Sequence, residues 1–306
     1  MAILKLNEGW RSLCFESARR HVAASFSTSI QEPELRDLVL LVNHGVGSLC
    51  LCFTRSKIDC SEGLRGFTRP DKDRVALKLS STLALLLLLA ERCHIDLPLA
   101  VQMKIKLNAK KYPASIVRGS ALKYDAYQAT TGYGKGSKQV TTEEKEGDAH
   151  LFGHINRSWS KYTFRELRVQ LQKFARDRGW EKYHTPRNIC LALSGEAGEL
   201  CELFQFKDEE ACCAGLPEWT RHERDKLSQE LSDVVIYLTR LSDLCGIDLS
   251  AALMENDCLK LSCYRSHDGH RIHDLEQEHL GNRWRLALCV LLGLAATLLC
   301  IKRKRS

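Results

Sequence analysis

The stretch TRHERDKLSQELSDVVIYLTRL, residues 220–241, is the clearest indicator of the fold. It opens with Thr220 and Glu223, the Thr-x-x-Glu spacing of a capping box, in which the hydroxyl caps the helix and the glutamate reaches back. Apolar residues then recur every three or four positions, the period of an amphipathic helix: Leu227, Leu231, Val234, Val235, Leu238 and Leu241. The stretch therefore predicts a long helix over about 221–245, capped by Gly246.

Similar signals flank this helix in the second half of the chain. A second capping box begins at Thr163 and predicts a helix to about Arg178. Thr185, followed by a proline, predicts a helix over about 186–206, and Ser250 can start another. No segment here favours a strand, so we expect an all-α fold, a four-helix bundle in which short connections make neighbouring helices antiparallel.

The composition is that of a globular protein with room for two domains. The chain has 306 residues, of which 44% are hydrophobic and 27% charged, which excludes a wholly disordered protein. The net charge is only +7, and basic residues gather at 104–123 and at the extreme C-terminus without interleaved aromatic residues. We therefore expect no nucleic-acid partner.

The cysteines indicate an intracellular protein. The 14 cysteines are scattered, no secretory signal precedes them, and none has the CxxC spacing of a zinc site. Buried, reduced thiols are the interpretation that fits best, and they place the chain in the cytoplasm. A transit peptide in the arginine- and serine-containing residues 1–30 is a weaker alternative, because Glu8 and Glu16 lie in it.

Two pairs of carboxylates stand on the predicted helices, and the members of each pair are three residues apart, on one helical face. Side by side on a mainly apolar helix, such groups repel each other unless a cation lies between them. Four of them on facing helices suit a hard Mg²⁺ or Mn²⁺ ion. A solvated acidic face is the alternative. The four acids are Glu196, Glu199, Glu230 and Asp233.

The same region carries a family resemblance. The motifs are Trp180-Glu-Lys-Tyr-His184, Gly195-Glu-Ala-Gly-Glu199 and Glu230-Leu-Ser-Asp233, of which the last two give an E-x-x-E, spacer, E-x-x-D pattern. This pattern resembles the all-α nucleotide pyrophosphohydrolases of the MazG type, most closely the dCTP pyrophosphatase branch. It covers about a hundred residues, and its glycines, Gly195 and Gly198, suggest close approach of helices. The spacer between Glu199 and Glu230 is slightly longer than in the family pattern, so the resemblance does not extend to the loop around 208–217.

The resemblance implies a reaction and a set of site residues. A deoxynucleoside triphosphate, dCTP or a relative, would be cleaved to the monophosphate and pyrophosphate. The four acids would hold Mg²⁺, with Mn²⁺ as an alternative, and four further side chains would surround the base, although ordinary bundle core is the other interpretation of these. The four are Trp180, His184, Phe206 and Tyr237. The alternative function is a non-catalytic bundle, tethered to a membrane, that binds nucleotide or dimerises without turnover.

The first half of the chain repeats the second without its acids. GLRGFTRPD at 63–71 parallels GLPEWTRHE at 215–223, and CHIDL at 93–97 parallels CGIDL at 245–249. Through this offset of 151 to 152 residues the four acids fall on Gly45, Ser48, Lys78 and Ser81. We therefore expect tandem bundles, with a degenerate repeat over 1–125 and a catalytic bundle over 158–265.

The first repeat retains a tail that the second lacks. Lys104, Asn108, Lys111 and Tyr112 resemble the family's triphosphate-binding tail, and 254–263 has no such pattern. We expect self-association, as an internal pseudo-dimer or a homo-oligomer, and one hypothesis is that the first repeat lends its tail to the acids of the second. The alternative is that the first repeat is a decayed scaffold.

The remaining segments are connectors and a candidate anchor. Residues 126–157 are a polar linker, and 266–282 are a charged, histidine-containing connector. Residues 283–306 contain sixteen uncharged positions, 286–301, between basic flanks. This length is short for a bilayer, but flanking tryptophan and arginine can compensate, so a tail anchor facing the cytosol is a candidate. A buried terminal helix or a tail with no native role are the alternatives.

Overall fold

The computed structural model describes residues 12–26, 33–54, 63–120 and 159–256, which all fall within one unit, Met1–Leu259. These residues are helical, with one isolated bridge and no strand, so the predicted all-α class is confirmed. The first half contains α1 (Phe15–Phe26), α2 (Leu35–Cys52), α3 (Arg69–Arg92), α4 (Leu97–Lys111) and α5 (Ala114–Val117). The second half contains α8 (Phe164–Asp177), η1 (Glu181–Tyr183), α9 (Pro186–Glu202), η2 (Glu210–Cys212), α10 (Arg221–Leu244) and α11 (Leu249–Met254). The predicted linker, connector and anchor lie outside the described residues.

Local sequence explains where the helices begin and end. Thr163 and Thr220 each form the complete predicted capping box at the start of α8 and α10. Gly246 follows α10 with a φ of +67°, a conformation that suits glycine at a helix end. Helix α9 ends at Glu202, four residues before the predicted end, where the chain turns back through a hydrogen bond from Phe204 N to Cys201 O.

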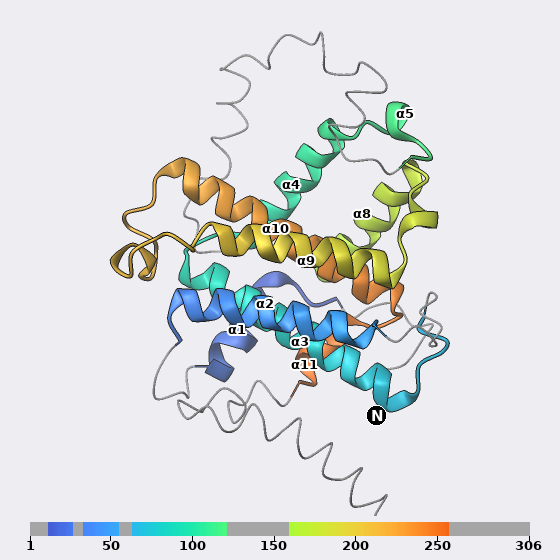
Figure 1. Ribbon diagram of the computed structural model, residues 1–306, viewed down its shortest axis with the longest axis horizontal. Helices are drawn as coiled ribbons and strands as arrows, with labels where there is room; N and C mark the ends of the chain where they lie inside the picture. The colour runs from blue at the N-terminus through green and yellow to red at the C-terminus, as the bar shows by residue number, and fades with distance from the viewer. Residues whose placement is uncertain (1–11, 27–32, 55–62, 121–158, 257–306) are drawn as a thin grey trace, which may run out of the picture. The chain divides into compact units, whose positions relative to one another are not determined.

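The two longest helices, α3 and α10, organise the packing. Helix α3 packs against α1, α2 and α11, α10 packs against α8, α9 and α4, and the two long helices also contact each other. Figure 1 shows α2 and α9 side by side, in line with their extensive contact. Helix α4 of the first half thus packs on α10 of the second half, and α11 of the second half packs on α3 of the first. Each half thus contributes one helix, α4 or α11, that packs on the long helix of the other half.

Matched backbone hydrogen bonds accompany this packing. Gly63 N donates to Leu244 O at the end of α10, and Gly215 N donates to Arg92 O at the end of α3, both over 2.7 Å. Both glycines have positive φ, +74° and +79°. The beginnings of α1 and α8 are joined in a similar way, by Phe15 N to Tyr162 O at 2.9 Å and Phe164 N to Leu13 O at 3.1 Å.

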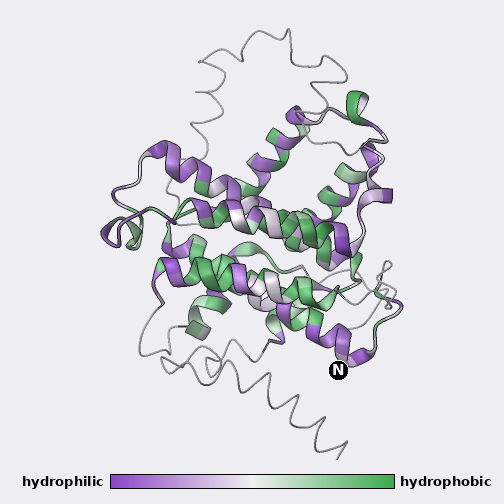
Figure 2. Ribbon diagram, viewed as in Figure 1, coloured by the Kyte–Doolittle hydropathy of each residue, from purple (hydrophilic) through white to green (hydrophobic). Residues whose placement is uncertain are grey.

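Apolar faces form the core. Figure 2 shows that α10 is hydrophilic where it begins, and its side chains are mostly buried from Leu227 onward. Helix α2 has the length and composition of a membrane span, yet one of its faces, which includes Leu38, Val42 and Leu49, is buried in the bundle. The nine cysteines within the described residues are free thiols, and four of them are buried.

Candidate active site

Three of the four predicted acids converge between α9 and α10. One oxygen from each of Glu196, Glu230 and Asp233 lies within 4.8 Å of the others, a spacing suited to a shared cation. We refer to these three residues as the acidic triad. Glu199 is exposed and stands outside the triad, one turn along α9 from Glu196.

Burial and mutual repulsion make the triad unfavourable without a cation. Burial, followed by the charges of Asp233, Glu199 and Glu230, raises the pKa of Glu196 to about 8. Burial also raises the pKa of Glu230 and of Asp233. The Oε2 atom of Glu230 is buried and has no hydrogen-bond partner in the described part of the chain. An oxygen-rich cluster with an unpartnered buried oxygen fits a divalent metal ion.

Helix α4 of the first half reaches the triad. Lys104 Nζ lies 2.5 Å from Asp233 Oδ2, and the two side chains are only 13% and 10% exposed. Asn108, one turn further along α4, also hydrogen-bonds to Asp233. The charge of Lys111 lowers the pKa of Glu230, opposing the effect of burial. Two of the predicted tail residues therefore contact the site directly, and Lys111 acts on it through its charge.

A pocket of about 610 Å³, counting its open mouth, adjoins the triad. Five of the predicted site residues line it together with Asp233: Asn108, Tyr112, Trp180, His184 and Tyr237. Phe206 does not line it, because its side chain is 90% exposed beyond the end of α9. The expectation that Gly195 and Gly198 permit close helix contact is wrong, since a Cβ at either position meets no atom of the described residues within 4 Å.

Sequence reasoning missed the other residues of the pocket wall. They are Ile105, Leu171, Phe174, Ile236 and Arg240. Asp233, Ile236, Tyr237 and Arg240 follow the i, i+3, i+4, i+7 spacing of one helical face, so continuing the face of Asp233 along α10 would have identified Ile236 and Arg240. No local signal marks Ile105 on α4 or Leu171 and Phe174 on α8.

The segment after α4 holds the aromatic wall of the pocket. Trp180 Nε1 donates to Ser120 O over 2.6 Å, and Tyr183 Oη donates to Gly119 O over 2.9 Å. The Tyr112 and Trp180 rings meet edge to face, with centroids 5.5 Å apart. The first half therefore positions an aromatic residue of the second half as well as contacting its acids.

The arrangement has the chemistry of a nucleoside triphosphate site. An acidic triad that suits a cation lies beside a lysine, which favours a polyphosphate, and both adjoin a pocket with flat aromatic walls, which favours a base. Tyr237 links the two regions: it lines the pocket, and burial followed by the charges of Glu196 and Asp233 raises its pKa.

Comparison with known proteins agrees with this chemistry. No protein-family model and no solved structure matches the chain. Bovine dCTP pyrophosphatase 1 is 45% identical over 95 residues, 31% of this chain and 55% of the bovine protein. The human protein of the same name is 42% identical over 105 residues, 34% and 61% of the two chains. The mouse protein is 40% identical over 121 residues, 40% of this chain and 68% of the relative. The match thus spans 55% and 61% of the bovine and human proteins, and more than two thirds of the mouse protein. On this evidence the chain belongs to the dCTP pyrophosphatase family.

Proposed function

We propose that this chain is a Mg²⁺-dependent nucleotide pyrophosphohydrolase that converts dCTP, or a closely related dNTP, and water to the monophosphate and pyrophosphate. The observation that carries the proposal is the acidic triad beside a base-sized aromatic pocket, in a chain related to dCTP pyrophosphatases. A bound Mg²⁺ would neutralise phosphate charge and acidify the attacking water. Mn²⁺ suits the same oxygen ligands.

The chain's own residues would act in three ways. Glu196, Glu230 and Asp233 would hold the metal ion, with Glu199 at its exposed side. Lys104 and Asn108 would turn from Asp233 toward the triphosphate, since a lysine ammonium binds phosphate as a point charge. The oxygen of a water molecule bonds to phosphorus, the P–O bond that links the α and β phosphates breaks, and pyrophosphate leaves. A carboxylate of the site accepts the proton of the water.

Pyrophosphate release from a panel of dNTPs, with and without Mg²⁺, tests the activity. Glu230→Gln keeps the side-chain shape and removes one charge of the triad, so we expect release to fall at least a hundredfold. Glu218→Gln is the matched control, because Glu218 is exposed on the loop before α10. A folded wild-type protein that binds dCTP but releases no pyrophosphate would favour the non-catalytic alternative.

We further propose that the site is composite, with metal ligands from the second half and phosphate contacts from the first. The ion pair between Lys104 and Asp233 supports this arrangement. Lys104→Met should lower kcat/KM for dCTP at least tenfold, whereas Lys106→Met, an exposed position on the same helix, should leave it unchanged. Equal rates for the two variants would show that the second half is sufficient.

The internal symmetry supports a tandem repeat that forms a pseudo-dimer. Beyond the paired glycines, Asn256 Nδ2 donates to Ser81 Oγ over 3.0 Å, at the positions that the repeat offset matches to Lys104 and Asp233. A Cβ at Gly45, matched to Glu196, would lie 2.5 Å from Thr82 Oγ1. Because these matched positions are neutral or crowded, they form no counterpart of the acidic triad in the first half.

The assembly of the chain and its location in the cell follow from the proposed activity and the internal symmetry. We propose that the pseudo-dimer is the minimal active unit in the cytosol, where nucleotide-pool enzymes act, and that copies of the chain can associate further. The candidate anchor at 286–301 lies outside the described residues. Light scattering coupled to size exclusion would measure the assembly, and fractionation of cells expressing the chain with and without residues 283–306 would test membrane attachment.

A further inference from the structure

His184 lines the pocket with one ring nitrogen already engaged. Arg240 donates its Nε–H to His184 Nδ1 over 3.1 Å. A guanidinium nitrogen only donates, so Nδ1 must be unprotonated and the hydrogen of the neutral ring lies on Nε2. Burial, followed by the charge of Arg240, lowers the pKa of His184 to about 4, which keeps the ring neutral at pH 7. Nε2–H has no partner in the described part of the chain and is left for a ligand.

Arg240 is itself held in one orientation. Its Nη1 atom contacts Asp243 Oδ2 at 2.5 Å, and the two side chains are 10% and 8% exposed. The other oxygen of Asp243 accepts hydrogen bonds from Arg168 Nε at 2.7 Å and Gln172 Nε2 at 2.9 Å, both on α8. The guanidinium is therefore fixed by a carboxylate that two further donors hold in place.

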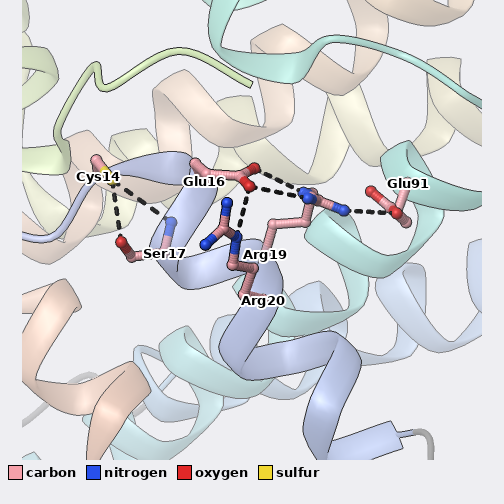
Figure 3. Close-up of polar contacts among 6 residues, drawn as sticks. All are labelled: Cys14, Glu16, Ser17, Arg19, Arg20 and Glu91. Atoms are coloured by element: carbon pink, nitrogen blue, oxygen red, sulfur yellow. Dashed lines mark hydrogen bonds and ion pairs between the residues drawn. The ribbon is translucent and has the colours of Figure 1, made fainter. Parts of the chain in front are cut away.

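The first half contains a similar helix-to-helix ion pair, but it has no counterpart of Arg240. Arg19 Nη1 on α1 donates to Glu91 Oε1 on α3 over 2.7 Å (Figure 3), much as Arg168 on α8 donates to Asp243 on α10. The residue three positions before Glu91 is Leu88, whereas the residue three positions before Asp243 is Arg240. An arginine at this position is thus not needed to join the two helices, and Arg240 contacts the pocket histidine instead.

We propose that Arg240 is a positioning residue that sets the base preference of the pocket, by holding His184 as an Nε2–H donor that selects a ring nitrogen acceptor such as cytosine N3. This inference rests on the proposed function and specifies which bases the site accepts. Thymine and uracil carry a hydrogen on N3, so the same contact would set two donors against each other. Leaving buried donors unpaired is what gives hydrogen-bonding sites their large discrimination.

The other polar groups of the pocket discriminate less between pyrimidine edges, because the hydroxyls of Tyr112 and Tyr237 can each donate or accept a hydrogen bond. The pocket's aromatic and aliphatic walls contact any flat base. Trp180 Nε1 already donates to Ser120 O, and Asn108 already bonds to Asp233. The hydrogen on His184 Nε2 is therefore a donor of fixed direction in the pocket, and it can distinguish one pyrimidine edge from another.

The test combines nitrogen NMR with substrate selectivity, both on the full chain. In ¹⁵N-labelled protein, His184→Gln identifies the His184 signals, and we expect the hydrogen on Nε2 at pH 7 in the wild type. We expect kcat/KM for dCTP to exceed that for dTTP and for 3-deaza-dCTP, which lacks the N3 acceptor, by about a hundredfold or more. Arg240→Leu, which copies Leu88, should reduce both ratios at least tenfold and leave the Mg²⁺ dependence unchanged.

Two further variants keep the test decisive. Arg19→Gln breaks the matched ion pair of the first half and should leave both ratios unchanged. Arg240→Lys keeps the charge beside Asp243 but loses the planar Nε donor, so it should reduce the ratios even if Arg240→Leu does not fold.

The proposal is overturned if the wild-type ring carries its hydrogen on Nδ1. It is also overturned if folded Arg240 variants keep the wild-type ratios, or if Arg19→Gln lowers them equally. If no dNTP is hydrolysed, the proposed function fails by itself. The tautomer, and the binding ratio of non-hydrolysable α,β-imido analogues of dCTP and dTTP, then decide the inference by the same criteria.

Discussion

Lys104→Met is the perturbation that most directly tests the charge balance of the site. Methionine keeps the apolar stem of the side chain but removes the ammonium that lies 2.5 Å from Asp233 Oδ2. Because both side chains are about nine-tenths buried, the effect is that of breaking a buried ion pair, which costs roughly 3–5 kcal/mol. The carboxylates can take up protons in response, so we expect the lower end, about 3 kcal/mol at pH 8 without metal.

Mg²⁺ should restore most of this loss. A ligand that binds only the folded state stabilises it by about 2.7 kcal/mol at a concentration of 100 times its Kd. Lys104 competes for Asp233 in the wild type, so the variant should gain more free energy of unfolding from Mg²⁺ than the wild type does. The variant should therefore have a low free energy of unfolding in EDTA and one close to that of the wild type in excess Mg²⁺.

The assay is urea unfolding followed by circular dichroism at pH 8, in EDTA and in Mg²⁺. Lys106→Met is the matched control, since Lys106 is exposed on the same helix and should change stability by less than about 0.5 kcal/mol. An equal loss in both variants, or no loss in Lys104→Met, would refute the conclusion that Lys104 compensates the acids. So would an identical response of wild type and variant to Mg²⁺.

Three further predictions concern the pocket and the helices. The pKa of His184 is lowered to about 4, so below pH 6.5 the unfolded state binds more protons than the folded state and the wild type loses stability. His184→Gln should remove up to about 3 kcal/mol of the loss between pH 6.5 and 4, measured by urea unfolding across that range. Trp180→Phe deletes the donor to a backbone carbonyl and should cost about 1–2 kcal/mol while raising KM for dCTP severalfold. Trp219→Phe loses an equivalent bond far from the pocket lining, so it should show a similar stability loss with an unchanged KM. Gly45→Ala would place a Cβ 2.5 Å from a threonine oxygen and should destabilise by about 1–3 kcal/mol, whereas Gly195→Ala has open space and should stabilise by about 0.5–1 kcal/mol, both measured by thermal unfolding.

Much of the fold was predictable from local sequence. The threonines at 163, 185 and 220 cap helices within hydrogen-bond reach of residues three positions on, so short-range chemistry identifies where α8, α9 and α10 begin. The pairing of Glu230 with Asp233 on one helical face was equally predictable, because one helix turn brings residues three apart onto one face. The same spacing also paired Glu196 with Glu199, which the structure leaves exposed outside the triad.

The predicted internal repeat was less informative about tertiary contacts. Matching motifs predicted that the first half lacks the acids and keeps a lysine- and asparagine-containing tail. They offered the hypothesis that this tail serves the acids of the second half, but not the helix packing that would bring it there. The structure packs α4 on α10, which brings Lys104 and Asn108 to Asp233.

Local sequence is enough to predict the helices, their capping and the residue types of an acidic, aromatic site, because these depend on neighbours a few residues apart. Which of these groups meet depends on how the helices pack. Arg240 and His184 are 56 residues apart, and their hydrogen bond depends on how η1 is placed beside α10. Phe206 had the same aromatic character as the pocket residues, yet the end of α9 leaves it 90% exposed. Contacts of this kind depend on packing between whole helix faces, which no short stretch of sequence encodes.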